Sequence, residues 1–176
     1  SPDPEAYLCI KRKTDTKILL LVLASMILMS PTITLTALLN KQMVLPSFMA
    51  PVEAWMQTQE ALAEQLTNTL LAGDGLLTFL SNLVVMALMA GITEEFLFRG
   101  ALQRIIGQWT ANHHIVIWSA AILFSAFHLQ FYGFLPRMLL GAYFGYLLYW
   151  SRNIWIPVFA HFANNAFAVI GMSDNR

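Results

Sequence analysis

The chain has 176 residues, of which 57% are hydrophobic and only 11% are charged. Soluble domains carry about 25% charged residues, so this composition excludes an ordinary soluble domain and is typical of a protein whose partner is the lipid bilayer. Lysines and arginines total 10 and acidic residues total 10, and without a basic surplus nucleic acid is excluded as a partner.

The first predicted element is a membrane-spanning helix from Ile18 to about Asn40. At 1.5 Å per residue this apolar run is long enough to cross the ~30 Å hydrocarbon core. It follows a polar N-terminal segment, residues 1–17, in which the cations at 11–13 and Lys17 are clustered. The positive-inside rule places such a cluster in the cytoplasm. We therefore expect an integral, multi-pass membrane protein with a cytoplasmic N-terminus.

The next predicted element is an amphipathic helix within residues 46–75. Trp55, Leu62, Leu66 and Leu70 recur at helical intervals among polar residues. This pattern predicts a connecting helix that lies at the membrane interface. Residues 18–75 thus comprise the first transmembrane helix and its amphipathic connector.

Residues 76–176 are predicted to form a membrane core of four further helices. The apolar segments run from about 76 to 106, from 115 to 128, from 134 to 150 and from 154 to about 170. Lipid offers backbone groups no hydrogen-bond partner, so each segment must be helical. The predicted fold class is all-α, a polytopic transmembrane bundle of about five membrane segments plus an interfacial amphipathic helix. Gly141 and Gly145, four residues apart, are expected to let two helices pack closely inside the bundle.

Polar residues inside these segments are few and regularly spaced. Three pairs are four residues apart and so share one helix face: Glu95 and Arg99, Phe124 and His128, and His161 and Asn165. Ionisable side chains within a membrane are costly and usually face a polar interior. We therefore expect the three helices to converge on one cavity.

The adjacent residues Glu94 and Glu95 are expected to have different roles. Glu95 can pair with Arg99 one turn later, whereas Glu94 points about 100° away around the helix and is free to face the cavity. There Glu94 is suited to act as a general base, a task that His128 can share. His161 and Asn165 offer N–H donors for a developing oxyanion.

Three motifs resemble those of a known family. E-E-F-L-F-R at 94–99 is similar to the EExxxR motif of the CPBP intramembrane endopeptidases, which include the CAAX proteases and bacteriocin-processing proteins and are also called Abi proteins. F-S-A-F-H at 124–128 matches the FxxxH motif of that family, and H-F-A-N-N at 161–165 matches its HxxxN motif. The motifs occur in the family's order, and the resemblance covers about residues 76–170.

The resemblance implies a role for each motif residue. Glu94 and His128 would activate a water molecule, and His161 and Asn165 would stabilise the oxyanion. The supporting residues would be Glu95, Arg99 and Phe124. No metal or other cofactor is part of this mechanism.

The predicted function is therefore an intramembrane endopeptidase that hydrolyses a peptide bond of a membrane-associated protein or peptide. A first alternative is a zinc-dependent intramembrane metallopeptidase, with Glu94, His128 and His161 as ligands and water in the fourth position. The lack of an HExxH pair and the presence of Asn165, a poor zinc ligand, favour the metal-free mechanism. A further alternative is a non-catalytic membrane scaffold or transporter, although the chain shows no inverted repeat of the transporter kind.

Other ionisable residues in this half of the chain have no predicted chemical role. His113 and His114 are expected in a loop between segments, and Arg137 is expected to anchor its helix or to line the mouth of the cavity.

Overall fold

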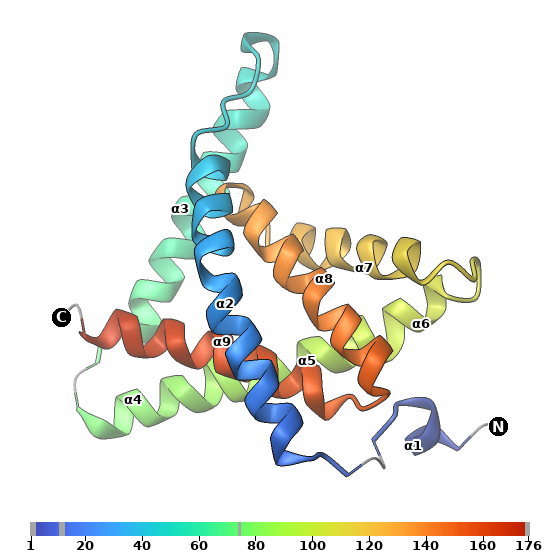
Figure 1. The fold of residues 1–176 in the computed structure, drawn as a ribbon. Coiled ribbons are helices and arrows are strands. Elements are labelled where there is room, and N and C mark those ends of the chain that lie inside the picture. Colours follow the sequence, from blue (N-terminus) through green and yellow to red (C-terminus); the bar gives the residue numbers. More distant parts are fainter. Residues whose placement is uncertain (1–2, 11–12, 74, 175–176) are drawn as a thin grey trace.

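Long apolar runs form the longest helices of the protein (Figure 1). The computed structural model describes residues 3–10, 13–73 and 75–174, and this part of the chain contains no β-strand. Asp15 begins the first long helix by accepting a hydrogen bond from the backbone N–H of Lys17 at 2.9 Å. Such a cap satisfies one of the free N–H groups at a helix start.

The elements follow one another with short connections. In chain order they are α1 (Pro4–Tyr7), α2 (Thr16–Lys41), the 3₁₀ turn η1 (Ser47–Met49), α3 (Ala50–Leu71), α4 (Leu76–Asn82), the π-helical η2 (Leu83–Met89), α5 (Ala90–Glu95), the π-helical η3 (Phe96–Leu102), α6 (Gln103–Ile106), α7 (His113–Phe127), the 3₁₀ turn η4 (Phe131–Gly133), α8 (Phe134–Ser151) and α9 (Trp155–Asp174). The elements from α4 to α6 form one continuous helix of 31 residues.

Three of these helices are long and apolar enough to cross a membrane: Thr16–Lys41, Leu76–Ile106 and Trp155–Met172. The other two predicted membrane segments differ from them. Helix α7 has 15 residues and so spans about 22 Å, less than the hydrocarbon core. Helix α8 has 18 residues and includes Arg137 and several aromatic residues with polar groups. The predicted all-α membrane bundle is confirmed; α7 is apolar but short, and α8 is less apolar than the three long helices.

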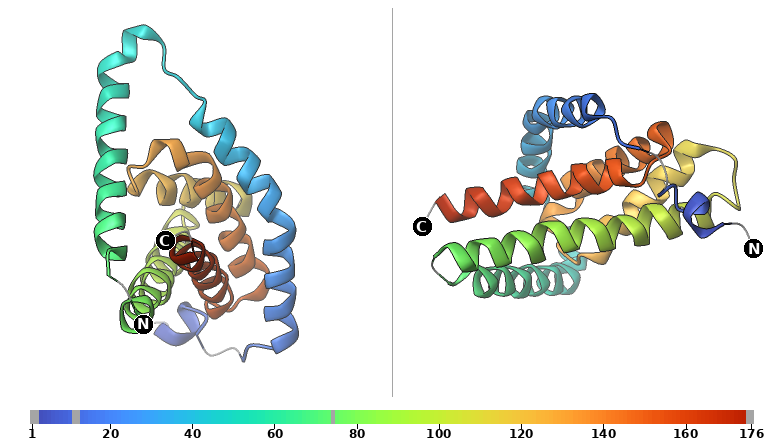
Figure 2. Two further views of the ribbon diagram at one scale, coloured as in Figure 1. Left: turned by 90° about the vertical axis from the view of Figure 1, so that its left-hand side faces the viewer. Right: turned by 90° about the horizontal axis from the view of Figure 1, so that it is seen from below.

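The three sequence motifs lie on helices that pack together in the core. The helix Leu76–Ile106 and α9 run side by side in opposite directions, as both views show (Figures 1 and 2). Helix α7 packs along α8, and α2 crosses α8 and α9. Val22, Phe144, Ile156 and Ala160 form the buried cluster where α2, α8 and α9 meet.

The glycines of α8 allow α7 to approach closely. A Cβ added to Gly141 would lie 3.0 Å from Phe124 Cδ1, and one added to Gly145 would lie 2.8 Å from a methyl carbon of Ile117. Both distances are shorter than ordinary van der Waals contact. The prediction that this glycine pair serves packing inside the bundle is confirmed.

Helix α3 is the predicted amphipathic helix, and its apolar face is turned outward. Leu62 and Leu66 are 55% and 61% exposed, whereas Glu60, Ala63 and Thr67 are partly buried. In Figure 2, α3 runs back in the direction opposite to α2, as the second arm of a wide hairpin. A ring contact of 5.3 Å between Trp55 and Phe131 connects α3 to η4. The face of α3 that carries Glu60, Ala63 and Thr67 is therefore directed toward the bundle, whereas Glu64, Gln65 and Asn68 are exposed.

Candidate active site

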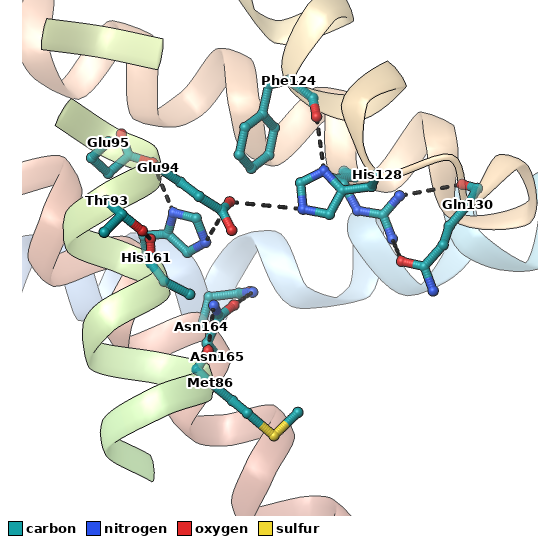
Figure 3. A network of polar contacts seen from close by, with 12 residues as sticks. Met86, Thr93, Glu94, Glu95, Phe124, His128, Gln130, His161, Asn164 and Asn165 are labelled. Carbon is teal, nitrogen blue, oxygen red and sulfur yellow. Dashed lines mark hydrogen bonds and ion pairs between the residues drawn. The ribbon is translucent and has the colours of Figure 1, made fainter. Parts of the chain in front are cut away.

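The three motifs meet at one cavity. Glu94 comes from the long helix Leu76–Ile106, His128 caps the C-terminal end of α7, and His161 and Asn165 come from α9. These side chains and Phe124 line a cavity of about 510 Å³. The structure thus brings together the residues that the sequence analysis placed on three separate helices (Figure 3).

Glu95 and Arg99 lie behind this cavity as a fully buried ion pair. Arg99 Nη1 donates to Glu95 Oε1 at 2.9 Å, and the two side chains are 1% and 0% exposed. Arg99 Nη2 donates to the carbonyl of Gly141 at 2.7 Å, and its guanidinium lies 4.6 Å from the ring centre of Phe124. The predicted pairing of Glu95 with Arg99 is confirmed, and it also links the first motif helix to α7 and α8.

Glu95 also holds the imidazole of His161. His161 Nδ1 lies 2.8 Å from Glu95 Oε1, the oxygen that receives Arg99. An ionised carboxylate only accepts hydrogen bonds, so Nδ1 of His161 is the donor. This contact between two helices fixes the ring orientation and directs Nε2 of His161 toward the cavity.

His128 is oriented in the same way by its own helix. Its Nδ1 lies 2.8 Å from the carbonyl oxygen of Phe124, and because a carbonyl only accepts, Nδ1 is again the donor. In the neutral ring Nε2 then carries a lone pair, and it faces Glu94. Both histidines therefore present Nε2 to the same carboxylate (Figure 3).

Glu94 lies between the two rings without touching either of them. Its Oε2 is 3.7 Å from His128 Nε2 and 3.8 Å from His161 Nε2, distances too long for direct hydrogen bonds. This oxygen is screened from solvent and has no hydrogen-bond partner among the described residues. The side chain as a whole is 28% exposed. A polar group left unsatisfied inside a protein is costly, so a hydrogen-bond donor that reached this oxygen would be bound favourably.

Asn165 is partly engaged by the helix opposite. Its Nδ2 donates to the carbonyl of Met86 at 3.1 Å, and its Oδ1 accepts from Asn164 Nδ2 at 3.3 Å. Met86 lies within η2, one of the widened π-helical segments that often occur at functional sites. One N–H of Asn165 is thus used for position, and the second N–H remains for a ligand in the cavity.

His161 donates its N–H group to a different acceptor from the one expected. An N–H of His161 was expected to stabilise an oxyanion, whereas the neutral ring donates its only N–H to Glu95. His161 can donate into the cavity from Nε2 only in its doubly protonated form. This consequence depends on a contact between helices, which the spacing of residues along one helix does not encode.

Some lining residues were not predicted as site residues. Asn164 and Gln130 line the cavity with Arg137, the residue expected at its mouth. Asn164 could have been noticed as the first of the two asparagines in H-F-A-N-N. Gln130, in the connection after α7, gives no such signal. His113 and His114 were expected in a loop but lie in the first turn of α7. His113 stacks on Tyr149 with ring centres 4.3 Å apart and does not line this cavity.

The three residues of the zinc alternative lie slightly too far apart to share one zinc ion. A zinc ion bound at 2.0–2.2 Å to three ligands in tetrahedral geometry brings the ligand atoms to about 3.3–3.5 Å from one another. Glu94 Oε2 is slightly farther than this from both Nε2 atoms. Among residues 3–10, 13–73 and 75–174, no group of three or more His, Cys, Asp or Glu side chains is placed to hold a metal ion.

Comparison with known families agrees with the motifs. The family model described as "Type II CAAX prenyl endopeptidase Rce1-like" matches residues 76–167, just over half of the 176 residues. The chain belongs to this family. The matched region of the Rce1-like family contains all the motif residues, from Glu94 to Asn165, so the resemblance to the CAAX proteases is confirmed.

A bacterial relative supports the same assignment. The protein named "Uncharacterized protein YpbD" of Bacillus subtilis (strain 168) is 29% identical over 89 residues, which are 48% of this chain and 42% of the relative. The chain therefore spans less than half the length of this curated relative. No solved structure matches the chain. Membership of an Rce1-like membrane protease family, together with three helices able to span a membrane, identifies an integral membrane protein.

Proposed function

We propose that the protein is an intramembrane endopeptidase that hydrolyses a peptide bond of a membrane-associated protein or peptide. The observation that carries the proposal is the position of Glu94 Oε2, an unsatisfied carboxylate oxygen between the Nε2 atoms of His128 and His161. A water molecule bound beside Glu94 would have two acceptors, the carboxylate of Glu94 and the lone pair of His128 Nε2. Membership of the Rce1-like family supports the same reaction class.

In the proposed reaction, Glu94 removes a proton from the water, assisted by the lone pair of His128 Nε2. The oxygen of the water forms a bond to the substrate carbonyl carbon, and the carbonyl oxygen takes the negative charge. Asn165 Nδ2, and Nε2 of His161 when the ring is doubly protonated, donate to this oxyanion. The carbon–nitrogen bond then breaks, and the proton held by Glu94 passes to the leaving amine.

Replacement of Glu94 by glutamine tests the proposal. Glu94→Gln keeps the shape of the side chain but removes its ability to accept a proton. We expect hydrolysis of a peptide library by the protein in lipid vesicles to fall by about 10²-fold or more, with normal membrane abundance. Glu64→Gln on the exposed face of α3 is the matched control and should keep full activity. Equal hydrolysis by the Glu94→Gln variant and the parent would overturn the role of Glu94 and leave a scaffold or transporter as the better explanation.

One observation favours the zinc-dependent alternative. Both histidines donate Nδ1–H to acceptors of the protein and direct Nε2 at Glu94, which is how metal-binding histidines are commonly held. Small movements of these three side chains would bring them to metal-binding distances. In that mechanism a zinc ion would supply the activated water.

Chelation distinguishes the two mechanisms. In the metal-free mechanism we expect activity to survive prolonged treatment with a strong chelator, and elemental analysis of the purified protein to find no stoichiometric metal. Loss of activity on chelation, with recovery on addition of zinc, would reassign Glu94, His128 and His161 as ligands.

A further inference from the structure

Arg137 is a charged residue of the cavity that the proposed reaction does not use. It lies in the first turn of α8 and lines the same cavity as Glu94, His128 and His161. No other lysine or arginine of the described chain lines this cavity. A cation in such a position indicates a binding partner, because burying a guanidinium in a membrane protein costs free energy unless it is paired.

The guanidinium of Arg137 is held in place by one neighbouring residue. Its Nη1 donates to the backbone carbonyl of Gln130 at 3.2 Å, and its Nη2 donates to Gln130 Oε1 at 2.8 Å. Gly133 leaves room for this arrangement, because a Cβ at that position would lie 3.2 Å from Nη2. The connection between α7 and α8 therefore fixes the orientation of the cation before any ligand binds.

The charge of Arg137 is not neutralised by contact. Among the described residues no carboxylate lies within 4.0 Å of its nitrogens, and Glu60 and Glu94 act on it only from a greater distance. Gln130 is a neutral acceptor and takes two of the five N–H groups, so three remain. The charge of Arg99, by contrast, is paired with the carboxylate of Glu95. Its guanidinium also donates to the carbonyl of Gly141 and packs on the ring of Phe124.

We propose that Arg137 binds a carboxylate of the peptide substrate and thereby positions the peptide bond beside Glu94. This inference rests on the proposed function and names a substrate class for it: peptides that carry a carboxylate close to the cleaved bond. A guanidinium with free N–H groups matches a carboxylate better than an ammonium does, because it can make two parallel hydrogen bonds. The carboxylate can be the C-terminal group of the peptide or the side chain of an aspartate or glutamate.

Peptide binding can be measured in a variant that does not hydrolyse, which tests the role of Arg137 independently of the proposed reaction. The probe is a hexapeptide library without Asp or Glu at its random positions, prepared in three forms: with a free C-terminal carboxylate, with a C-terminal amide, and with a C-terminal amide plus one glutamate. Binding is measured to the Glu94→Gln protein in lipid vesicles, with and without Arg137→Gln. Arg152→Gln is the matched control, because Arg152 is exposed and lies outside the cavity.

We expect the Glu94→Gln protein to prefer one carboxylate form over the neutral amide by about tenfold or more. Arg137→Gln should abolish this preference, and Arg152→Gln should leave it unchanged. Preference for the free C-terminus identifies the terminal carboxylate, and preference for the glutamate form identifies the side chain. Equal binding of all three forms, or a preference that survives Arg137→Gln, would overturn the inference.

A second variant covers the case in which Arg137→Gln does not fold. Arg137→Lys keeps the charge but cannot make the paired contact, so it should lose most of the preference. A lysine variant that retains the whole preference would overturn the role of the guanidinium. Carboxylate preference without any hydrolysis by the parent protein would instead contradict the proposed function and leave this binding site in place.

Discussion

Adjacent glutamates in one helix occupy opposite environments. Glu94 is 28% exposed in the cavity, whereas Glu95 is 0% exposed and accepts hydrogen bonds from both Arg99 and His161. The 100° turn between neighbouring residues produces this separation. The same oxygen of Glu95 thus neutralises a buried cation and fixes a ring of the cavity, so it acts on the site through His161 without facing the cavity itself.

Removal of either partner of the buried pair should destabilise the protein strongly. We expect Glu95→Gln or Arg99→Gln to lower the free energy of unfolding by about 3–5 kcal/mol, because each leaves an unpaired buried charge. The double variant should recover part of this loss. Thermal unfolding of the parent, the two single variants and the double variant, each purified in detergent, measures these losses. Arg152→Gln, at an exposed residue, should change stability by less than about 0.5 kcal/mol. Strictly additive losses would contradict the coupling between Glu95 and Arg99.

At the scale of elements, the site depends on how closely α5 approaches α9. Gly91 is buried at this contact, and an added Cβ would lie 3.2 Å from the backbone nitrogen of Phe162. Phe162 follows His161, whose ring is held by Glu95 on the other helix. The distance between the two backbones therefore sets the distance between the first and third motifs.

A methyl group at this contact should disturb the site. We expect Gly91→Ala to reduce stability by about 1–3 kcal/mol, because backbone cannot move aside as a flexible side chain can. Hydrolysis should fall as well, since α5 and α9 must separate. Gly171→Ala on α9 is the matched control, because its Cβ would meet no atom within 4 Å, and alanine favours a helix over glycine. Thermal unfolding and the peptide assay report both effects, and equal behaviour of the two variants would exclude a tight contact.

For the whole molecule, the outward side chains agree with a bilayer environment. Leu21 and Leu28 of α2 are 68% and 79% exposed, and Leu62 and Leu66 of α3 are directed outward as well. Exposed apolar surface of this extent is unfavourable in water and expected in lipid. The three motifs are directed inward, toward the cavity, so the proposed chemistry would take place in a polar interior enclosed by apolar helices.

The orientation of α2 in the membrane is a separate prediction. Lys17 and the cations at 11–13 precede this helix, and we propose that its start faces the cytoplasm. In a Cys9→Ser background, a cysteine at exposed position 13 (Lys13→Cys) should react with a membrane-impermeant maleimide only in inverted vesicles. Gln42→Cys, at the exposed other end of α2, should react only in right-side-out vesicles. Labelling of both positions from the same side would show that α2 does not span the membrane.

The sequence determined the helices and the faces that carry chemistry, because both depend on local spacing. Apolar runs predicted the membrane class, and four-residue spacing placed Glu95 with Arg99 and His161 with Asn165 on single faces. The glycines of α8 predicted a close helix contact for the same reason. The sequence also predicted membrane spans for α7 and α8, whereas the helices of the described chain that are long and apolar enough to cross a membrane are three others.

Only the tertiary structure decided which atoms meet between helices. Spacing along one helix cannot show that His161 gives its Nδ1–H to Glu95, that Asn165 donates to Met86, or that Gln130 holds Arg137. These partners are far apart in the chain or lie in a connection without a repeating pattern, and backbone packing brings them together. A hydrogen bond is decided by tenths of an ångström and by direction. Residue types and intervals therefore predicted the members of the site, and the packing of α5, α7 and α9 fixed their contacts.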